Sequence, residues 1–150
     1  AHHRDAALNE ALYNQAIIDA ARDKSHAGRL EHPGGTATTD NPLCGDRVTL
    51  DLESEAGRIA AVTHKTRGCL LTQAAASLLA AHALGRPVEE AAPLRDAIRA
   101  YLDGTTEEPP FPELAMLAPV RAVKSRHDCV TIAFDALAAA AAQLATEKPS

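Results

Sequence analysis

Three cysteines and one aspartate are the side chains of this sequence best suited to chemistry. Cys44 and Asp46 lie two residues apart in "NPLCGD", Cys69 follows a glycine, and Cys129 begins the apolar stretch "CVTIAFDAL". A thiolate and a carboxylate on one tight turn can bind a metal ion, and an accessible thiolate can exchange sulfur. None of the cysteines lies in a CxxC or HxxxH pattern, so spacing alone leaves metal binding, sulfur chemistry and a structural role open.

Alternating apolar residues predict a small antiparallel sheet that would carry the first of these thiols. Residues 48–52 ("VTLDL") alternate apolar and polar side chains, and residues 58–68 form a second strand after the turn "ESEAG". The threonine-rich residues 32–42 are typical of an edge strand. Ahead of the sheet, residues 5–24 carry apolar side chains at helical spacing, so we expect an amphipathic helix that ends near Gly28.

The remainder of the chain is predicted to be helical. Residues 69–85 and 87–104 are rich in alanine and leucine and end at glycines, as helices commonly do. The proline-rich residues 105–119 predict a solvated loop with a short turn at 114–117. The last helix is expected to begin at Asp128 as its N-cap. These elements predict an α+β fold, a small three-stranded antiparallel sheet with helices packed on one face.

Each cysteine is expected at a boundary between elements. Cys44 lies on a Pro/Gly turn, while Cys69 and Cys129 open helices, where unpaired amides and the positive end of the helix dipole favour a thiolate. A cysteine that serves only as a small buried hydrophobe needs none of these placements. We therefore expect the three thiols to share one site.

Length and charge exclude several classes of protein. The 150 residues fit one domain, 1–150, with residues 1–4 expected to be an appended tag or a disordered end. The net charge of −5 argues against nucleic acid as a partner. Without the apolar core of a secretory signal, the chain is expected to be cytoplasmic and its thiols free. Asp135 and Gln143 interrupt the longest apolar run, which predicts a buried helix and no membrane span.

Three blocks of the sequence resemble a known family. "NPLCGDRVTLDL", "GRIAAVTHKTRGCLLTQAAAS" and "APVRAVKSRHDCVTIAFDAL" are similar, in order, to the cysteine-bearing blocks of the IscU/SufU (NifU N-terminal-like) family of iron–sulfur cluster assembly proteins. The resemblance implies that Cys44, Asp46, Cys69 and Cys129 hold one zinc ion or a [2Fe-2S] cluster. It also implies a cysteine desulfurase and downstream iron–sulfur assembly or acceptor proteins as partners, and it agrees with the predicted fold.

The third block indicates which branch of the family the chain resembles. Within the family, a histidine directly before the third cysteine marks cluster scaffolds, whereas an insertion without it marks zinc-bearing sulfur acceptors of the SufU type. Here 59 residues (129 − 69 − 1) separate Cys69 from Cys129, Asp128 precedes Cys129, and Arg126 also fits the SufU branch. His127 is expected to be an exposed polar residue ahead of the helix and not a ligand.

The resemblance leads to a main hypothesis and two alternatives. In the main hypothesis Cys44 accepts persulfide sulfur from a cysteine desulfurase, and Asp46, an oxygen ligand in a soft site and therefore the easier one to displace, changes its hold on the metal as Cys44 leaves. Such a protein is at most a zinc-dependent sulfurtransferase. The first alternative is a scaffold that assembles and transfers a [2Fe-2S] cluster without catalytic turnover, and the second is a zinc ion that only stabilises the fold. The residues alone do not choose Cys44 over the other thiols.

Four other polar residues near the site or on the long helix are expected to have ordinary roles. His64 and His82 are expected to be surface or hydrogen-bonded histidines. Gln73 and Ser77, one and two turns after Cys69, are close enough to approach the site but are expected to be ordinary helix residues.

Overall fold

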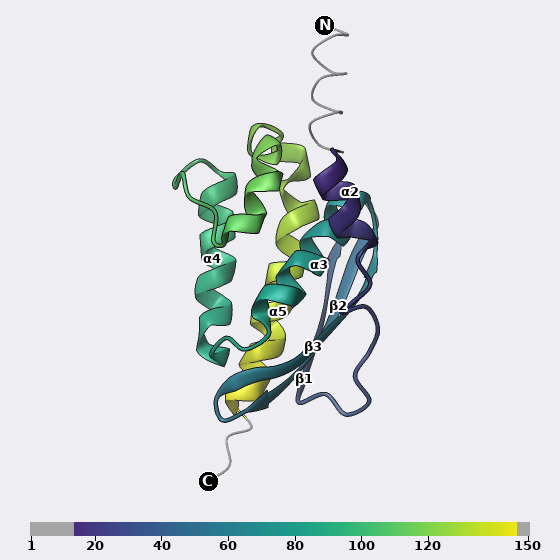
Figure 1. The fold of residues 1–150 in the computed structure, drawn as a ribbon, viewed down its shortest axis with the longest axis vertical. Helices are drawn as coiled ribbons and strands as arrows, with labels where there is room; N and C mark the ends of the chain where they lie inside the picture. The colour runs from purple at the N-terminus through teal and green to yellow at the C-terminus, as the bar shows by residue number, and fades with distance from the viewer. Residues whose placement is uncertain (1–13, 147–150) are drawn as a thin grey trace, which may run out of the picture.

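A three-stranded antiparallel sheet forms one layer of the computed structural model, which describes residues 14–146 (Figure 1). Its strands are β1 (Gly35–Asn41), β2 (Asp46–Glu55) and β3 (Arg58–Arg67), in the order β1-β2-β3. The apolar residues of β2 all point to the buried face, as their alternation predicted. The predicted turn "ESEAG" is shorter than expected, because β2 continues to Glu55 and only residues 56–57 lie between the strands.

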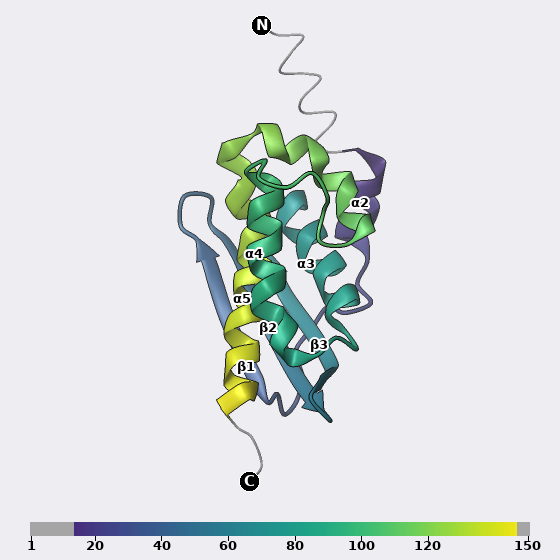
Figure 2. The ribbon, with the colours of Figure 1, turned by 90° about the vertical axis from the view of Figure 1, so that its left-hand side faces the viewer.

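Helices cover one face of this sheet, so the predicted α+β fold is confirmed. The helices α3 (Leu70–Ala83) and α5 (His127–Thr146) pack directly on the strands. The helix α4 (Ala91–Leu102) follows a short 3-10 turn, η1 (Val88–Glu90), and packs on the outer side of α5 (Figure 2). Within residues 14–146, no helix combines the length and apolar character needed to cross a bilayer.

Within the described residues, the first helix ends two residues before the predicted end at residue 24. The helix α2 (Gln15–Arg22) packs against α3 and has Asn14 as its N-cap, whose side-chain oxygen accepts a hydrogen bond from the Ile17 amide at 3.1 Å. It ends at Arg22, six residues before the predicted stop near Gly28. Residues 5–13 of the prediction lie outside the described residues.

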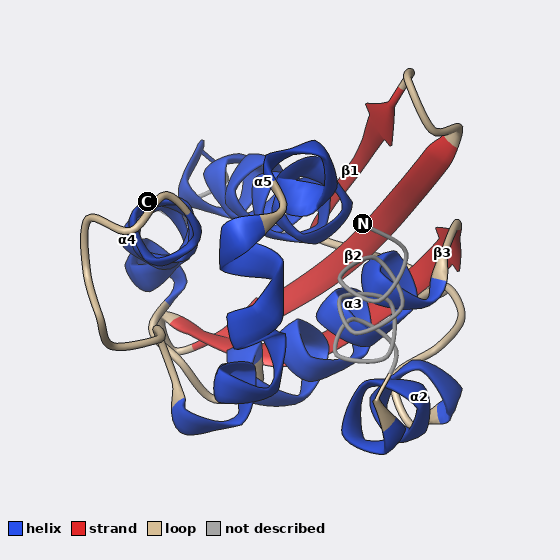
Figure 3. Cartoon of the chain, turned by 90° about the horizontal axis from the view of Figure 1, so that it is seen from above, coloured by secondary structure: helices blue, strands red, loops and turns tan. Residues whose placement is uncertain are grey.

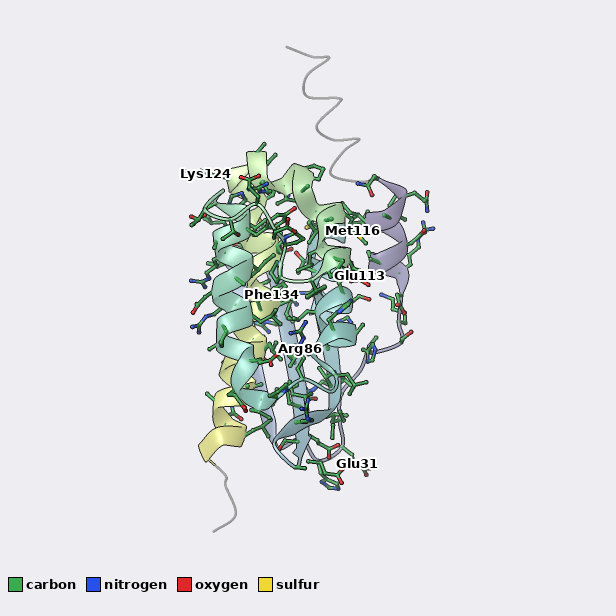
Figure 4. The ribbon with its side chains drawn as sticks, turned by 60° about the vertical axis from the view of Figure 1, so that its left-hand side comes forward. Glu31, Arg86, Glu113, Met116, Lys124 and Phe134 are labelled. Carbon is green, nitrogen blue, oxygen red and sulfur yellow. The ribbon has the colours of Figure 1, made fainter. Side chains whose placement is uncertain are left out.

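The core lies between the sheet and the helices. Phe134 on α5 is its largest fully buried side chain and lies behind α4 in Figure 4. Around it are fully buried aliphatic side chains from the sheet and from five helical segments: Ile17, Val48, Leu50, Leu52, Leu71, Leu79, Ile98, Leu102, Leu114, Leu117 and Leu137. Burial of this apolar surface supplies the main driving force for folding, and the two helices that begin with cysteines are thereby held against the sheet.

The predicted solvated loop at 105–119 is wrong in its second half. Residues Pro112–Ala122 form a 3-10 helix, η2, which a second short turn, η3 (Lys124–Arg126), joins to α5. Apolar side chains recur every third position, at Phe111, Leu114, Leu117 and Val120, and all four are buried. A 3-10 helix has three residues per turn, so this spacing places them on one face. Pro112 is at the first helical position, where its missing N–H costs no hydrogen bond.

Aromatic stacking attaches η2 to α3. The Phe111 ring stacks on His82 with centroids 3.9 Å apart, and His82 Nε2 lies 3.1 Å from a carboxylate oxygen of Glu113. The guanidinium of Arg86 lies 6.0 Å from the Phe111 centroid, and Figure 4 shows Arg86 and Glu113 on this side of the molecule. His82 is thus a stacked histidine with a carboxylate beside its ring, which agrees with its predicted ordinary role.

Candidate metal centre

A tight turn at residues 42–45 joins β1 to β2 and presents the first thiol. The Asn41 carbonyl accepts hydrogen bonds from the amides of Cys44 (3.2 Å) and Gly45 (2.8 Å). Gly45 has φ +72°, in the left-handed region that glycine adopts without strain. Cys44 is exposed on this turn, whereas Asp46 begins β2 and is only 3% exposed. The turn therefore separates an accessible thiol from a buried carboxylate two residues away.

The second thiol lies where β3 leads into α3. Cys69 is the N-cap of α3 and is half-buried, and its amide donates to Asp46 Oδ1 at 3.2 Å. The Thr72 hydroxyl lies 3.4 Å from Cys69 Sγ. One turn into the helix, Gln73 Nε2 donates to the Gly68 carbonyl at 2.9 Å and holds the segment before the cysteine in place.

The third thiol, Cys129, lies close to both Cys44 and Asp46. Cys129 lies in the first turn of α5 and is fully buried. Its sulfur, the Cys44 sulfur and a carboxylate oxygen of Asp46 all lie within 4.8 Å of one another. Cys69 is not part of this trio, but its thiol accepts a hydrogen bond from Cys129. The structure thus brings all four predicted site residues to one end of the sheet, the end that faces the viewer in Figure 3.

The Cys69 and Cys129 thiols shift each other's pKa values in opposite directions. The hydrogen bond from Cys129, aided by Thr72, holds the pKa of the Cys69 thiol well below its ordinary value. The same hydrogen bond, together with burial and the negative charges of Cys69 and Asp46, raises the pKa of Cys129. A helix start favours both thiolates, but for Cys129 these local effects outweigh it. Of the two thiols, Cys69 is therefore the one whose ionisation its surroundings favour.

The environment of the Asp46 carboxylate shows whether these four side chains suit a metal ion. Among the described residues, its Oδ2 atom has no hydrogen-bond partner although it is buried. A buried, unpaired carboxylate oxygen is costly unless a cation lies beside it. The other donors are thiols, which zinc and iron–sulfur clusters prefer. The arrangement therefore fits a zinc ion or iron held by sulfur and one oxygen.

The histidines near these elements are not directed at the centre. His127 Nε2 donates to the backbone carbonyls of Val120 (3.0 Å) and Arg121 (3.2 Å), which agrees with the expectation that it is no ligand. His64 is buried and not at the surface; its Nδ1 is bonded to Thr66 at 2.8 Å, and its Nε2 has no partner among the described residues. Both rings therefore support the backbone or the core.

Sequence reasoning missed the residues that support the ligands. Gly68 was noted only as the end of a strand, Gln73 as an ordinary helix residue, and Thr72 was not singled out. Thr72 and Gln73 lie three and four residues after Cys69, a spacing at which the helix period brings residues to the same face, and Gly68 directly precedes the cysteine. That spacing is the signal that identifies them in the sequence.

Comparison with known proteins identifies the family. A model described as "NifU-like N terminal domain" matches residues 12–148. A crystal structure of the N-terminal part of a nitrogen-fixing NifU-like protein from Brucella abortus superposes with a TM-score of 0.85 at 29% identity, covering 94% of this chain and 99% of that one. The fold and the span of the match therefore agree.

Relatives with assigned names include both branches. An "Iron-sulfur cluster assembly scaffold protein IscU 1" of Archaeoglobus fulgidus is 30% identical over 98 residues, 65% of this chain and 64% of the relative, so less than two thirds of its length is matched. An IscU of Thermotoga maritima with the same description is 28% identical over 127 residues, covering 84% of this chain and 89% of its own. The "Zinc-dependent sulfurtransferase SufU" of Bacillus subtilis is 23% identical over 130 residues, covering 85% and 88%. Since the family model spans nearly the whole chain, this protein belongs to the family of NifU-like N-terminal domains.

Proposed function

We propose that this protein takes part in iron–sulfur cluster assembly as a metal-binding sulfur acceptor of the SufU type. The exposure of Cys44 beside the buried Asp46 and Cys129 and the half-buried Cys69 supports this most directly. A sulfur donor is another protein, so only an accessible thiol can meet its persulfide. The long connection between Cys69 and Cys129, part of which is the packed helix η2, supports the SufU branch.

Four side chains would hold the metal in this proposal: Cys44, Asp46, Cys69 and Cys129. A bound zinc or iron ion would keep its sulfur ligands deprotonated near neutral pH. The trio within 4.8 Å supports three of these ligands, and the hydrogen bond that the Cys69 amide donates to Asp46 supports the fourth. Asp46 would be the sole oxygen ligand.

The sulfur transfer proposed for Cys44 is a thiol–persulfide exchange. The Cys44 thiolate attacks the terminal sulfur of a persulfide on a cysteine desulfurase. A new S–S bond forms on Cys44, the S–S bond of the donor breaks, and the donor cysteine leaves as a thiolate. No oxidant or reductant is consumed, and the product is a persulfide on Cys44 that downstream iron–sulfur assembly proteins can receive.

A second candidate function is a scaffold for a [2Fe-2S] cluster. Two relatives at 28–30% identity carry the name of a cluster assembly scaffold, and three thiols with one carboxylate can hold such a cluster as cargo. The two functions are separated by the zinc, iron and acid-labile sulfide content of protein purified without oxygen. One zinc per chain without sulfide supports the acceptor, whereas equal iron and sulfide support the scaffold.

Sulfur transfer itself is tested with a purified cysteine desulfurase and radiolabelled cysteine. Protein-bound label that is released by reductant is expected on the parent and on Ser77→Ala, a matched control on α3. Cys44→Ser is expected to lose nearly all of it. Full labelling of Cys44→Ser would exclude Cys44 as the acceptor.

A further inference from the structure

Gly68 and Asp46 approach each other more closely than any other residue at position 68 would allow. A Cβ atom added to Gly68 would lie 2.5 Å from Asp46 Oδ1, 2.9 Å from its Cγ and 3.1 Å from its Cβ. Contacts below 3.0 Å are essentially never found for real Cβ atoms. Any side chain at position 68 therefore has to displace the Asp46 carboxylate or the backbone beside it.

The backbone on both sides is held in place. Residues 47 and 67 pair directly across β2 and β3, so the strand positions of Asp46 and Gly68 are determined by the sheet. The Gly68 carbonyl accepts a hydrogen bond from Gln73, which anchors it to α3. The carboxylate is the part that can yield, and its only route is away from the Cys69 amide to which Oδ1 is bonded.

The orientation of Asp46 has a consequence for the metal centre. With Oδ1 bonded to the Cys69 amide, Oδ2 is left buried and unpaired, and Asp46 shares the trio with Cys44 and Cys129. The carboxylate is thus prepared as a ligand before any ion binds. A ligand held by outer contacts in this way gains affinity because binding requires no reorganisation.

We propose that Gly68 is a positioning residue of the metal centre. Because Gly68 has no side chain, the Asp46 carboxylate can lie in the orientation that binds a metal ion. The proposal rests on the proposed metal-binding function. Asp46 is 3% exposed and packs against Gly68, whereas Cys44 is exposed on the 42–45 turn. Asp46 is therefore the fixed ligand of the proposed centre, and Cys44 is the one that a sulfur donor can reach.

A double-mutant cycle on zinc affinity tests this role. Zinc affinity of folded protein is measured by competition with a chromophoric chelator for the parent, Gly68→Ala, Asp46→Ala and the double variant. We expect Gly68→Ala to lower affinity by about 10- to 100-fold, the usual range for a disrupted outer contact. The double variant is expected to match Asp46→Ala to within about threefold, since the clashing carboxylate is already gone. The Co²⁺ spectrum of Gly68→Ala should change toward that of Asp46→Ala.

Gly35→Ala is a matched control at the opposite end of β1. A Cβ there would lie against the Ala140 carbonyl oxygen, so the substitution creates a comparable clash away from the centre. It is expected to lower the melting temperature of metal-free protein while leaving the zinc affinity of the folded fraction within about twofold. A similar loss of affinity in Gly35→Ala would show that the effect of Gly68→Ala is general destabilisation and would overturn the proposal.

The remaining outcomes separate this proposal from the proposed function. Parent-like zinc affinity in Gly68→Ala, with Asp46→Ala impaired, would overturn only the positioning role. A penalty that persists in full in the Asp46→Ala background would also overturn it. If Gly68→Ala does not fold, the double variant should regain folding, and its failure to do so counts against the proposal. A parent that binds neither zinc nor iron would overturn the proposed function as well.

Discussion

Acidification should destabilise this protein through His64. The imidazole is 4% exposed, and burial, together with the positive charges of Lys24 and His26, lowers its pKa from 6.5 to about 4, although Asp23 partly opposes the shift. In the unfolded chain the ring takes up a proton near pH 6.5, whereas in the folded protein it does so only near pH 4. The titration of His64 therefore does not lower the free energy of unfolding above pH 6.5, but it lowers this free energy as the pH falls from 6.5 to 4.

The size of this loss follows from the difference between the two pKa values. At about 1.4 kcal/mol per pKa unit, the shift of His64 amounts to roughly 3 kcal/mol at pH 4, of which about 2 kcal/mol is reached at pH 5. Because the ring is almost completely buried, solvent screening reduces this little. For a domain of ordinary stability the loss at pH 5 is a substantial fraction of the total.

Urea unfolding of metal-free, reduced protein between pH 7.5 and pH 5 measures this term. His64→Gln is the control, since glutamine does not titrate in this range while the carboxylates elsewhere affect both proteins equally. The parent should lose about 2 kcal/mol more stability than His64→Gln over this interval. Equal losses in the two proteins would mean that His64 titrates as a solvated histidine, and the reasoning from its burial would be refuted.

Two further substitutions test the packing of η2 and the environment of Cys69. Phe111→Ala removes a buried ring that stacks on His82, and a loss of about 3–5 kcal/mol in the free energy of unfolding is expected from urea titration; a loss below 1 kcal/mol would show that η2 contributes little to the fold. Thr72→Val keeps the buried shape but removes the hydroxyl beside the Cys69 sulfur, so the pKa of Cys69, measured from the pH dependence of its alkylation in metal-free protein, should rise. An unchanged pH dependence would mean that Thr72 does not stabilise the thiolate.

Local patterns were sufficient to predict the sheet and the main helices. The alternation of Val48, Leu50 and Leu52 specifies one buried face of a strand whatever lies against it. The alanine-rich stretch after Gly68 has high helix propensity along its whole length. The proximity of Cys44 to Asp46 also follows from the sequence, because a tight turn cannot separate residues two positions apart. These features depend on neighbours in the chain.

The packed helix η2 shows where local reasoning failed. Its prolines indicated a loop, and the three-residue spacing that starts at Phe111 was overlooked, because 3-10 helices of this length are uncommon and depend on a surface to pack against. Here that surface consists of α4 and α2, which η2 contacts, and of His82 on α3, on which the Phe111 ring stacks. The helix is stable because of tertiary contact, and propensity alone did not reveal it.

The chemistry of the centre was decided by the tertiary structure. Cys129 is 83 residues from Asp46 (129 − 46) and meets it only because α5 packs along β1 and β2. The same packing buries Cys129 while the 42–45 turn leaves Cys44 exposed, so thiols of equal intrinsic chemistry differ in their access to solvent. The sequence alone determined which residues can bind a metal. Only the folded chain determines that Asp46 packs against Gly68 and that Cys44 faces outward, because burial and distance are properties of the fold.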